Sequence, residues 1–443
     1  MIEGLLFAHV VALIAVYRLL SGRIGRVLAL TWLSYMTIFT VLKPVLLYYY
    51  DLYYPYSTND AGAVESLLAG SLMFLGVLWV AVRFFGDRAP PALAMRIYDF
   101  DGISIRGVVG AFLVLMLVSF GGSTLKFNSP TYMFSLVDAF EASMNLANGS
   151  WYLNYIAEIL FYGLLMVVAC SYWRFKMTKS LAIVLGTILL TYFWTKMSSR
   201  TGALVVIVGW MSCYFSVERQ RRINIFWLGV AGYLMLILLY VGNLVRTGNA
   251  GNLSLDTAIF GAVFAAASDL SPVDNATLMY SEMWQHDPTW FLYLLGSITP
   301  TVLLPSSLFP FKIPADKDAE LTRIFFPGGA DTAFYHEGST LTFTVPATGY
   351  ADAGYLGVFV ACVLYAMIMC WYIWLFRNGS RSTRFLAGYL IVVHTVGYRL
   401  SIETLLVAFY SSMMFFVFTR RLALFFGSWS AAVQPAPRRI DLA

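Results

Sequence analysis

Two opposite charges stand in an otherwise apolar stretch near the end of the chain. The segment "VGYRLSIETLL" (396–406) contains Arg399 and Glu403 within a run from Phe385 to Thr419 that is almost wholly apolar. Residues four apart share a face when they lie on one helix, so the two side chains are expected to be neighbours. Charged residues inside a membrane are costly and indicate function by default. The pair is therefore the first candidate for a functional site.

Two more arginines occur in similar settings. Arg200 lies in "MSSRTGAL" and Arg246 in "NLVRTGNA", each beside small residues that let other groups approach. Each alone is explained equally well by a side chain reaching the lipid headgroups. Taken with Arg399, they favour an anionic headgroup carried on a lipid, most simply a pyrophosphate, because a guanidinium binds phosphate through two hydrogen bonds. Arg323 is a further candidate for this role.

The polar segment that ends near residue 348 offers groups for acid–base chemistry. Asp331, His336 and Glu337 follow the pair Gly328–Gly329, and Asp352 stands at the start of the next apolar run. One of these four could act as a general base toward a hydroxyl group, although a hydrated loop with ordinary turn residues explains each of them alone. The sequence has no HExxH motif and only four histidines, so no metal and no cofactor are expected.

The composition is that of an integral membrane protein. Of the 443 residues, 59% are hydrophobic and only 12% are charged, and the mean hydropathy is +0.72. Soluble domains carry about 25% charged residues. No long polar segment suggests a separate soluble domain, so residues 1–443 are predicted to form one all-α membrane domain. The net charge of +5 does not suggest a nucleic-acid partner in this setting.

Apolar runs of about 20 residues predict the membrane-spanning helices. About eleven are expected, at residues 4–20, 27–48, 64–85, 107–122, 151–173, 181–197, 202–217, 224–245, 350–376, 385–399 and 402–419. Every odd-numbered connection is basic, including "ERQRR" (218–222) and "RNGSRSTR" (377–384). The positive-inside rule then places these connections in the cytoplasm, the N-terminus outside and the C-terminus inside.

A long outer loop is predicted at residues 246–348. Its apolar segment "TWFLYLLGSITPTVLLP" (289–305) is too short to span comfortably, so short or re-entrant helices are expected. Long loops of this kind are usually functional. No internal repeat is evident, which disfavours a transporter built from inverted halves.

This layout resembles the Wzy family of O-antigen and related polysaccharide polymerases. The resemblance is carried by the helix count, the long outer loop before the last spans, "SSRTG" (198–202), "GGAD" (328–331) and "ATGYADAGYLGVFV" (347–360). It implies a glycosyltransferase of GT-C architecture in the bacterial inner membrane, related to O-antigen ligases and working in lipopolysaccharide biosynthesis. With the orientation given by the positive-inside rule, the long loop and the N-terminus would be periplasmic and the C-terminus cytoplasmic. This departs from many family members, which have about twelve helices and a cytoplasmic N-terminus.

The resemblance further implies the reaction and the partners. The growing glycan would pass from undecaprenyl pyrophosphate onto the terminal sugar of a new lipid-linked repeat unit, without a metal. Family members rely on arginines in outer loops, which correspond by setting to Arg200, Arg246 and Arg399. In this hypothesis Arg399 binds pyrophosphate and Glu403 orients it. Partners would be undecaprenyl-pyrophosphate-linked oligosaccharides and membrane lipids, with a chain-length regulator left open.

Three alternatives remain at this point. An O-antigen ligase has a similar layout but transfers the glycan to lipid A–core. A transporter of lipid-linked sugars would need charges along a path through both leaflets, whereas the candidate charges gather near the outer face. A purely structural membrane subunit would leave the outer arginines unexplained. The sequence does not identify the sugar, the linkage, the pathway, the general base or the oligomeric state.

Overall fold

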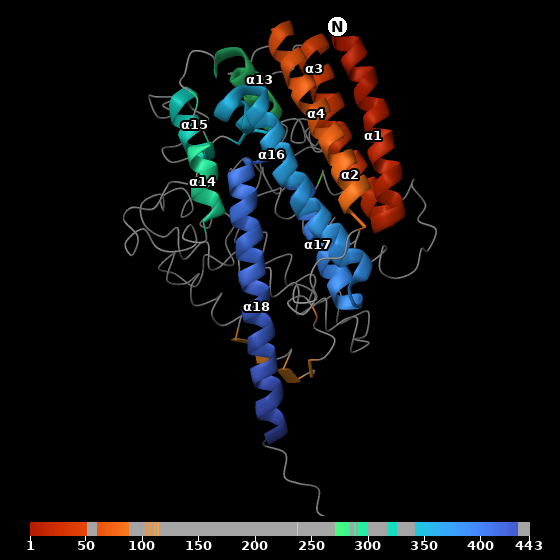
Figure 1. The fold of residues 1–443 in the computed structure, drawn as a ribbon, viewed down its shortest axis with the longest axis vertical. Coiled ribbons are helices and arrows are strands. Elements are labelled where there is room, and N and C mark those ends of the chain that lie inside the picture. The colour runs from red at the N-terminus through yellow and green to blue at the C-terminus, as the bar shows by residue number, and fades with distance from the viewer. Residues whose placement is uncertain are drawn as a thin grey trace, which may run out of the picture.

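The computed structural model describes the two ends of the chain and parts of its long loop, and every regular element in the described part is helical (Figure 1). The described residues are 1–50, 60–87, 271–283, 291–299, 317–325 and 342–432, with isolated residues or pairs between 99 and 114 and at 237 and 288. The all-α class is thus confirmed for this part of the chain.

The N-terminal segment forms two helical hairpins. Helix α1 (Ile2–Ile24) is followed by α2 (Arg26–Thr37), a π-helical turn (Ile38–Leu42) and α3 (Lys43–Tyr50), and then by α4 (Ala61–Phe85). The chain reverses after α1 at Gly25, whose φ of 82° is accessible to glycine at little cost. Asp60 starts α4 by accepting a hydrogen bond from the backbone N–H of Ala63 at 3.1 Å.

The C-terminal segment forms three long helices. They are α16 (Val345–Asn378), α17 (Arg381–Val396) with a 3₁₀ turn (Gly397–Arg399), and α18 (Ile402–Ala432). The hydroxyl of Ser380 caps α17 by accepting a hydrogen bond from the N–H of Thr383. Helices α16 and α17 form an antiparallel pair beside α4 and α1 (Figure 1).

Aromatic side chains fill the core between the two segments. Phe74 of α4 packs against Tyr365 of α16 and Tyr398 of the 3₁₀ turn, with ring centroids 4.8 Å apart in both pairs. The hydroxyl groups of Tyr398 and Ser71 are hydrogen-bonded at 3.0 Å. These contacts join residues far apart in the sequence, and two of them hold Tyr398 of the 3₁₀ turn at the end of α17 against α4.

Three short helices cover one end of this bundle. They are α13 (Ser271–Glu282), α14 (Leu292–Ile298) and α15 (Lys317–Phe325) (Figure 1). Helix α13 packs against α4 and α16, and α14 packs against α18. All three belong to the segment 246–348 that was predicted to be a long outer loop. Helix α14 has seven residues and is far too short to span a membrane, as expected for 289–305.

Five helical segments in the described residues are long and apolar enough to cross a membrane: Ile2–Ile24, Arg26–Tyr49, Ala61–Phe85, Val345–Asn378 and Ile402–Ser428. They match five of the predicted spans, and the predicted 385–399 span is the shorter α17 with its 3₁₀ turn. The predicted span 107–122 is described only at a few residues. The predicted spans at 151–173, 181–197, 202–217 and 224–245 lie outside the described residues, except for residue 237.

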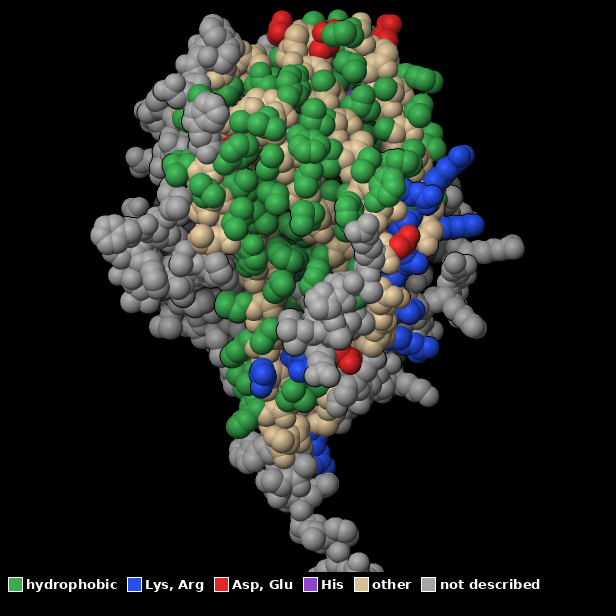
Figure 2. Space-filling model, in the orientation of Figure 1, with side chains coloured by type: hydrophobic (Ala, Val, Ile, Leu, Met, Phe, Trp, Pro, Cys, Tyr) green, Lys and Arg blue, Asp and Glu red, His purple; other side chains and the backbone are tan. Residues whose placement is uncertain are grey.

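Charged side chains are separated along the bundle. On the face shown in Figure 2, acidic side chains gather at the end near the N-terminus, while Lys and Arg side chains occupy the other half. Apolar side chains cover the surface between them. This distribution suits a protein embedded in a bilayer with its two ends in water. We call the ends the acidic end and the basic end.

Candidate functional site

Helix α16 is broken eight residues after its start. Ala353 and Gly354 leave helical geometry, and Gly354 has a φ of 58°, which favours glycine. The break folds the first segment (345–352) against the start of the second. A Cβ on Gly349 would lie 2.6 Å from the carbonyl oxygen of Gly357, so no larger residue fits there without a backbone shift. The motif "ATGYADAGYLG" therefore encodes a tight, glycine-dependent helix break.

A buried lysine lies at this break. The Nζ of Lys317, at the start of α15, forms an ion pair with Oδ1 of Asp352, the last helical residue before the break. It also lies 3.8 Å from Oε1 of Glu403 in the first turn of α18. The side chains of Lys317 and Glu403 are 0% exposed and that of Asp352 is 2% exposed. One cation thus connects two carboxylates from two different helices.

Asp318 attaches the same short helix to the start of α18. Its Oδ2 accepts hydrogen bonds from the backbone N–H of Ser401 at 3.3 Å and from the hydroxyl of Thr404 at 3.2 Å. A carboxylate at this position also interacts favourably with the partial positive charge at a helix N-terminus. The hydroxyl of Ser401 in turn accepts the N–H of Thr404 at 3.2 Å and caps the helix. We call Lys317, Asp318, Asp352 and Glu403 the acidic-end cluster.

The cluster combines one cation with three carboxylates. Neither oxygen of Glu403 accepts a hydrogen bond from any residue that the structure describes. A buried carboxylate without full compensation is expensive, so the site retains capacity to receive a hydrogen-bond donor or a further cation. This excess of buried acid is the main electrostatic feature of the acidic end.

Arg399 precedes α18 in the chain and does not lie on the same helix as Glu403. It ends the 3₁₀ turn, and Leu400 is extended (φ −113°, ψ 167°) before α18 begins. The expectation that Arg399 and Glu403 share one helical face is therefore wrong, because the chain leaves the helix between them. The cation beside Glu403 is Lys317. Arg399 is half-buried, and no described residue forms a hydrogen bond or ion pair with its side chain.

A second buried ion pair lies at the same end. Lys43, at the start of α3, is 2.9 Å from Oδ2 of Asp274 on α13, and both side chains are at most 5% exposed. The neighbouring Asn275 donates a hydrogen bond to the carbonyl of Thr342 at 3.0 Å, just before α16. This pair fixes α13 against the bundle, so the covering helices are held by polar contacts as well as by packing.

Tyr280 of α13 reaches from the covering helices toward α4. Its ring lies 4.8 Å from that of Tyr350, and its hydroxyl is the nearest neighbour that a Cβ on Gly70 would meet. Burial raises the pKa of the Tyr280 phenol well above its ordinary range, so the phenol remains protonated. No hydrogen-bond partner for this hydroxyl is found among the described residues.

The predicted site residues fall into two groups. Asp352, Arg399 and Glu403 lie at the acidic end around the break in α16. Arg323 lies on α15, later in the helix than Lys317, and its side chain is not among those that the structure describes. The other predicted residues lie outside the described part of the chain: Arg200, Arg246, Asp331, His336 and Glu337.

Sequence reasoning gave no role to Lys317 and Asp318. They stand in a polar loop segment, "ADKDAELTRIF" (315–325), where lysine and aspartate are ordinary surface residues. Their burial depends on where α15 packs, which no local pattern reveals. The sequence signal that could have identified these two residues is a charged segment between long apolar stretches, in a chain with few charges.

Comparison with known proteins gives no match to the chain from any family model, curated protein or solved structure.

Proposed function

We propose that the protein is a membrane-embedded glycosyltransferase that polymerises lipid-linked oligosaccharide repeat units. The growing glycan would pass from undecaprenyl pyrophosphate to the terminal sugar hydroxyl of a new lipid-linked unit. The proposal rests on the resemblance of sequence motifs and layout, and on one structural observation. Three distant segments (317–318, 352 and 399–403) meet where α16 is broken, at the end of the bundle opposite the basic residues.

The reaction breaks one bond and forms another. The bond between the anomeric carbon and the pyrophosphate oxygen breaks, and the acceptor hydroxyl oxygen forms the new glycosidic bond. The hydroxyl proton passes to a base, and undecaprenyl pyrophosphate leaves with the electron pair. Negative charge develops on the departing pyrophosphate, so preorganised cations are the natural means of stabilising it.

Arg399 is the described residue best suited to bind that pyrophosphate. It is half-buried at the acidic end, and no described residue competes for its guanidinium. The 3₁₀ turn that carries it is fixed by the hydrogen bond between Tyr398 and Ser71, and α18 behind it is fixed by Asp318. The backbone of Arg399 is therefore held in place, and the planar fork of its guanidinium is itself preorganised for a planar oxyanion pair. Arg200, Arg246 and Arg323 are proposed to contribute further positive charge.

The structure favours an anchoring role for Asp352 over a role as base. Its carboxylate is buried and ion-paired with Lys317, so it would have to leave that pair to accept a proton from an acceptor sugar. We therefore place the general base among Asp331, His336 and Glu337. Asp352, Glu403 and Lys317 would hold the broken helix and the start of α18 around the substrate.

The orientation in the membrane follows the charges. Arg18, Arg23 and Arg83 lie at the basic end, as do the arginines of the α16–α17 connection. The positive-inside rule would place this end in the cytoplasm and the acidic end in the periplasm. Lipid-linked repeat units would then meet Arg399 at the periplasmic face of the inner membrane.

The direct test is polymerisation by purified protein. The protein would be incubated with a lipid-linked repeat unit, without added metal, and the products separated by gel. The proposal expects a ladder of longer lipid-linked glycans. An unchanged repeat unit, over several repeat-unit structures and with a folded protein, would contradict it.

A transporter of lipid-linked sugars is the second candidate, and the broken helix favours it. Transporters commonly place substrate and ion sites at breaks in membrane helices, and α16 has such a break beside a buried ion pair. Reconstituted vesicles distinguish the two. A transporter moves an intact labelled lipid-linked sugar between leaflets, whereas a polymerase lengthens it on one side.

A further inference from the structure

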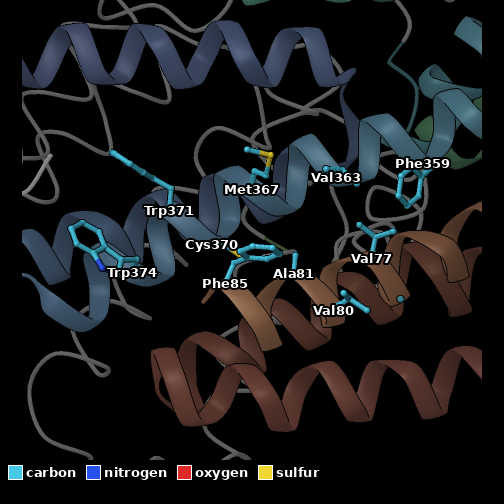
Figure 3. A pocket seen from close by; sticks show the side chains of 11 residues that line it. Val77, Val80, Ala81, Phe85, Phe359, Val363, Met367, Cys370, Trp371 and Trp374 are labelled. Atoms are coloured by element: carbon cyan, nitrogen blue, oxygen red, sulfur yellow. The ribbon is translucent and has the colours of Figure 1, made fainter. Parts of the chain in front are cut away.

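The basic end carries a long apolar groove between α4 and α16. It has a volume of about 670 Å³ and is lined along α4 by Gly76, Val77, Val80, Ala81 and Phe85, and along α16 by Phe359, Val363, Met367, Cys370, Trp371 and Trp374. Figure 3 shows Phe85, Ala81 and Val77 of α4 next to Cys370 and Phe359 of α16, with Met367 and Trp371 on the other side of α16 in this view. Several of them are widely exposed, including Met367 at 62% and Phe85 at 52%. The groove therefore opens to the surroundings of the protein along its length.

The length of the groove matches one leaflet of a bilayer. On α4 the lining runs from Gly76 to Phe85, and on α16 from Phe359 to Trp374. At 1.5 Å of rise per residue these distances are about 14 Å and 22 Å. The hydrocarbon core of a bilayer is about 30 Å thick, so a single leaflet contributes about 15 Å. The groove thus has the size for a chain of one leaflet and stops short of crossing the membrane.

Three arginines lie in the last turns of helices α1, α4 and α16, and Phe85 and Trp374 line the groove near the ends of α4 and α16. Arg83 is in the last turn of α4, Arg377 in the last turn of α16, and Arg23 in the last turn of α1. Arg23 interacts electrostatically with both Arg83 and the groove residue Cys370. These three helix ends also carry partial negative charge, which favours cations there. The cations therefore gather where a lipid in the groove would place its headgroup.

One carboxylate neutralises this group only in part. Asp87 is 2.8 Å from a terminal nitrogen of Arg23 and also forms an ion pair with Arg377. Three guanidinium groups against one carboxylate leave an excess of two positive charges. The Nε of Arg23 is buried without a hydrogen-bond partner among the described residues. These three arginines can therefore bind an anion while Asp87 keeps its ion pairs with Arg23 and Arg377.

We propose that this groove is a binding site for an anionic phospholipid of the leaflet at the basic end. One acyl chain would lie between α4 and α16, and the headgroup phosphate would contact Arg83, Arg377 and Arg23. Basic pockets between membrane helices bind anionic headgroups in this way. The lipid would join α1, α4 and α16 at the end away from the acidic-end cluster. This site does not depend on the proposed glycosyltransferase activity.

Gly76 makes the groove easy to fill by a single substitution. It lines the groove on α4, and a Cβ built there meets nothing within 4 Å. Gly76→Leu should therefore occupy the space without disturbing the core. Gly22 on α1 offers a matched control, since a Cβ there also meets nothing within 4 Å and Gly22 does not line the groove. To test the arginines at the end of the groove, Arg83→Gln would be compared with the control Arg421→Gln on α18.

The experiment is native mass spectrometry of the purified protein in detergent. Protein would be mixed with equal amounts of phosphatidylglycerol and phosphatidylcholine, and the lipids retained after partial delipidation would be counted. We expect the unaltered protein and both controls to retain one phosphatidylglycerol in preference to phosphatidylcholine. Gly76→Leu is expected to lower retention of both lipids, and Arg83→Gln to lower the preference by fivefold or more.

Three results would overturn the proposal. The first is equal retention of the two lipids by the unaltered protein. The second is unchanged phosphatidylglycerol retention by Gly76→Leu and Arg83→Gln while both remain folded by circular dichroism. The third is conversion of a dimer to a monomer by Gly76→Leu, which would identify a second copy of the chain as the occupant. The same spectra report the dimer mass, so this outcome needs no separate sample.

Discussion

The two ends of the helical bundle hold their charges in opposite ways. At the acidic end Lys317, Asp352 and Glu403 are almost completely buried. At the basic end Asp87 is 53% exposed and Arg377 39% exposed, although they also form an ion pair. Burying an ion pair requires removing both charges from water, whereas an exposed pair exchanges readily with water.

The two ends therefore differ in how much desolvation their charges cost. Exposed arginines at the basic end, such as Arg377, need no costly desolvation, although Arg23 is only 10% exposed. We propose that these arginines orient the protein in the membrane and bind lipid. The acidic-end cluster is costly, because replacing a buried pair by apolar residues often leaves a protein equally stable. Its position, at a helix break beside a half-buried arginine, supports the functional role that we propose for this end.

The largest stability effect is expected from Lys317→Met. The substitution leaves Asp352 and Glu403 buried without their cation, which should lower the free energy of unfolding by about 3–5 kcal/mol. Adding Asp352→Asn should recover part of the loss. Thermal unfolding in detergent measures both variants, with Arg377→Met as the exposed control. Equal melting temperatures for Lys317→Met and Arg377→Met would remove the contrast between the two ends.

Gly349→Ala should have the next largest effect. A Cβ there lies 2.6 Å from the carbonyl oxygen of Gly357, so the two parts of broken α16 must separate. Overpacking of this kind costs about 1–3 kcal/mol. Gly4→Ala on α1 is the matched control, since its Cβ meets nothing within 4 Å. Chemical unfolding in mixed micelles compares them, and a neutral Gly349→Ala would mean that the break does not require close contact.

Asp318→Asn should have a smaller effect. The amide oxygen can still accept a bond from Ser401 or Thr404, but the negative charge at the N-terminus of α18 is lost. Such charges contribute about 0.3–2 kcal/mol. The control is Asp99→Asn, whose carboxylate accepts an exposed hydrogen bond from Ser380 at 3.3 Å. If Asp99→Asn lowered the melting temperature more than Asp318→Asn does, the proposed stabilisation of the N-terminus of α18 by Asp318 would be contradicted.

The smallest effect is expected from Arg377→Gln in detergent without added lipid. Its pair with Asp87 is exposed, and such pairs contribute about 0–1 kcal/mol and are weakened by salt. At low salt the substitution should lower the melting temperature only slightly, and at high salt the decrease should be smaller still. A loss comparable to that of Lys317→Met would show that the two ends do not differ as described.

The membrane helices were predictable because their signal is local. A run of apolar side chains of the right length identifies a span wherever it occurs, and the predicted 4–20, 27–48, 64–85, 350–376 and 402–419 all coincide with long helices. The helix bounds extend further, as for α18 to Ala432, because helices continue past the hydrocarbon core into the headgroup region.

The pairing of charges was not predictable in the same way. The spacing of Arg399 and Glu403 suggested a shared helix face, but a 3₁₀ turn and an extended Leu400 separate them. The true neighbour of Glu403 is Lys317, 86 residues earlier, and only packing of α15 brings it there. Local spacing drew attention to Glu403 but did not identify its partner.

The most direct test of the central claim is the product ladder formed by Arg399→Lys. The charge is retained, but the planar fork that binds a pyrophosphate is lost. We expect product formation from a lipid-linked repeat unit to fall roughly 10²-fold, as when one preorganised donor to a developing charge is removed. The control Arg421→Lys, at an exposed position of α18, should leave it unchanged. A full ladder from correctly folded Arg399→Lys would contradict the assignment of the acidic end as the pyrophosphate site.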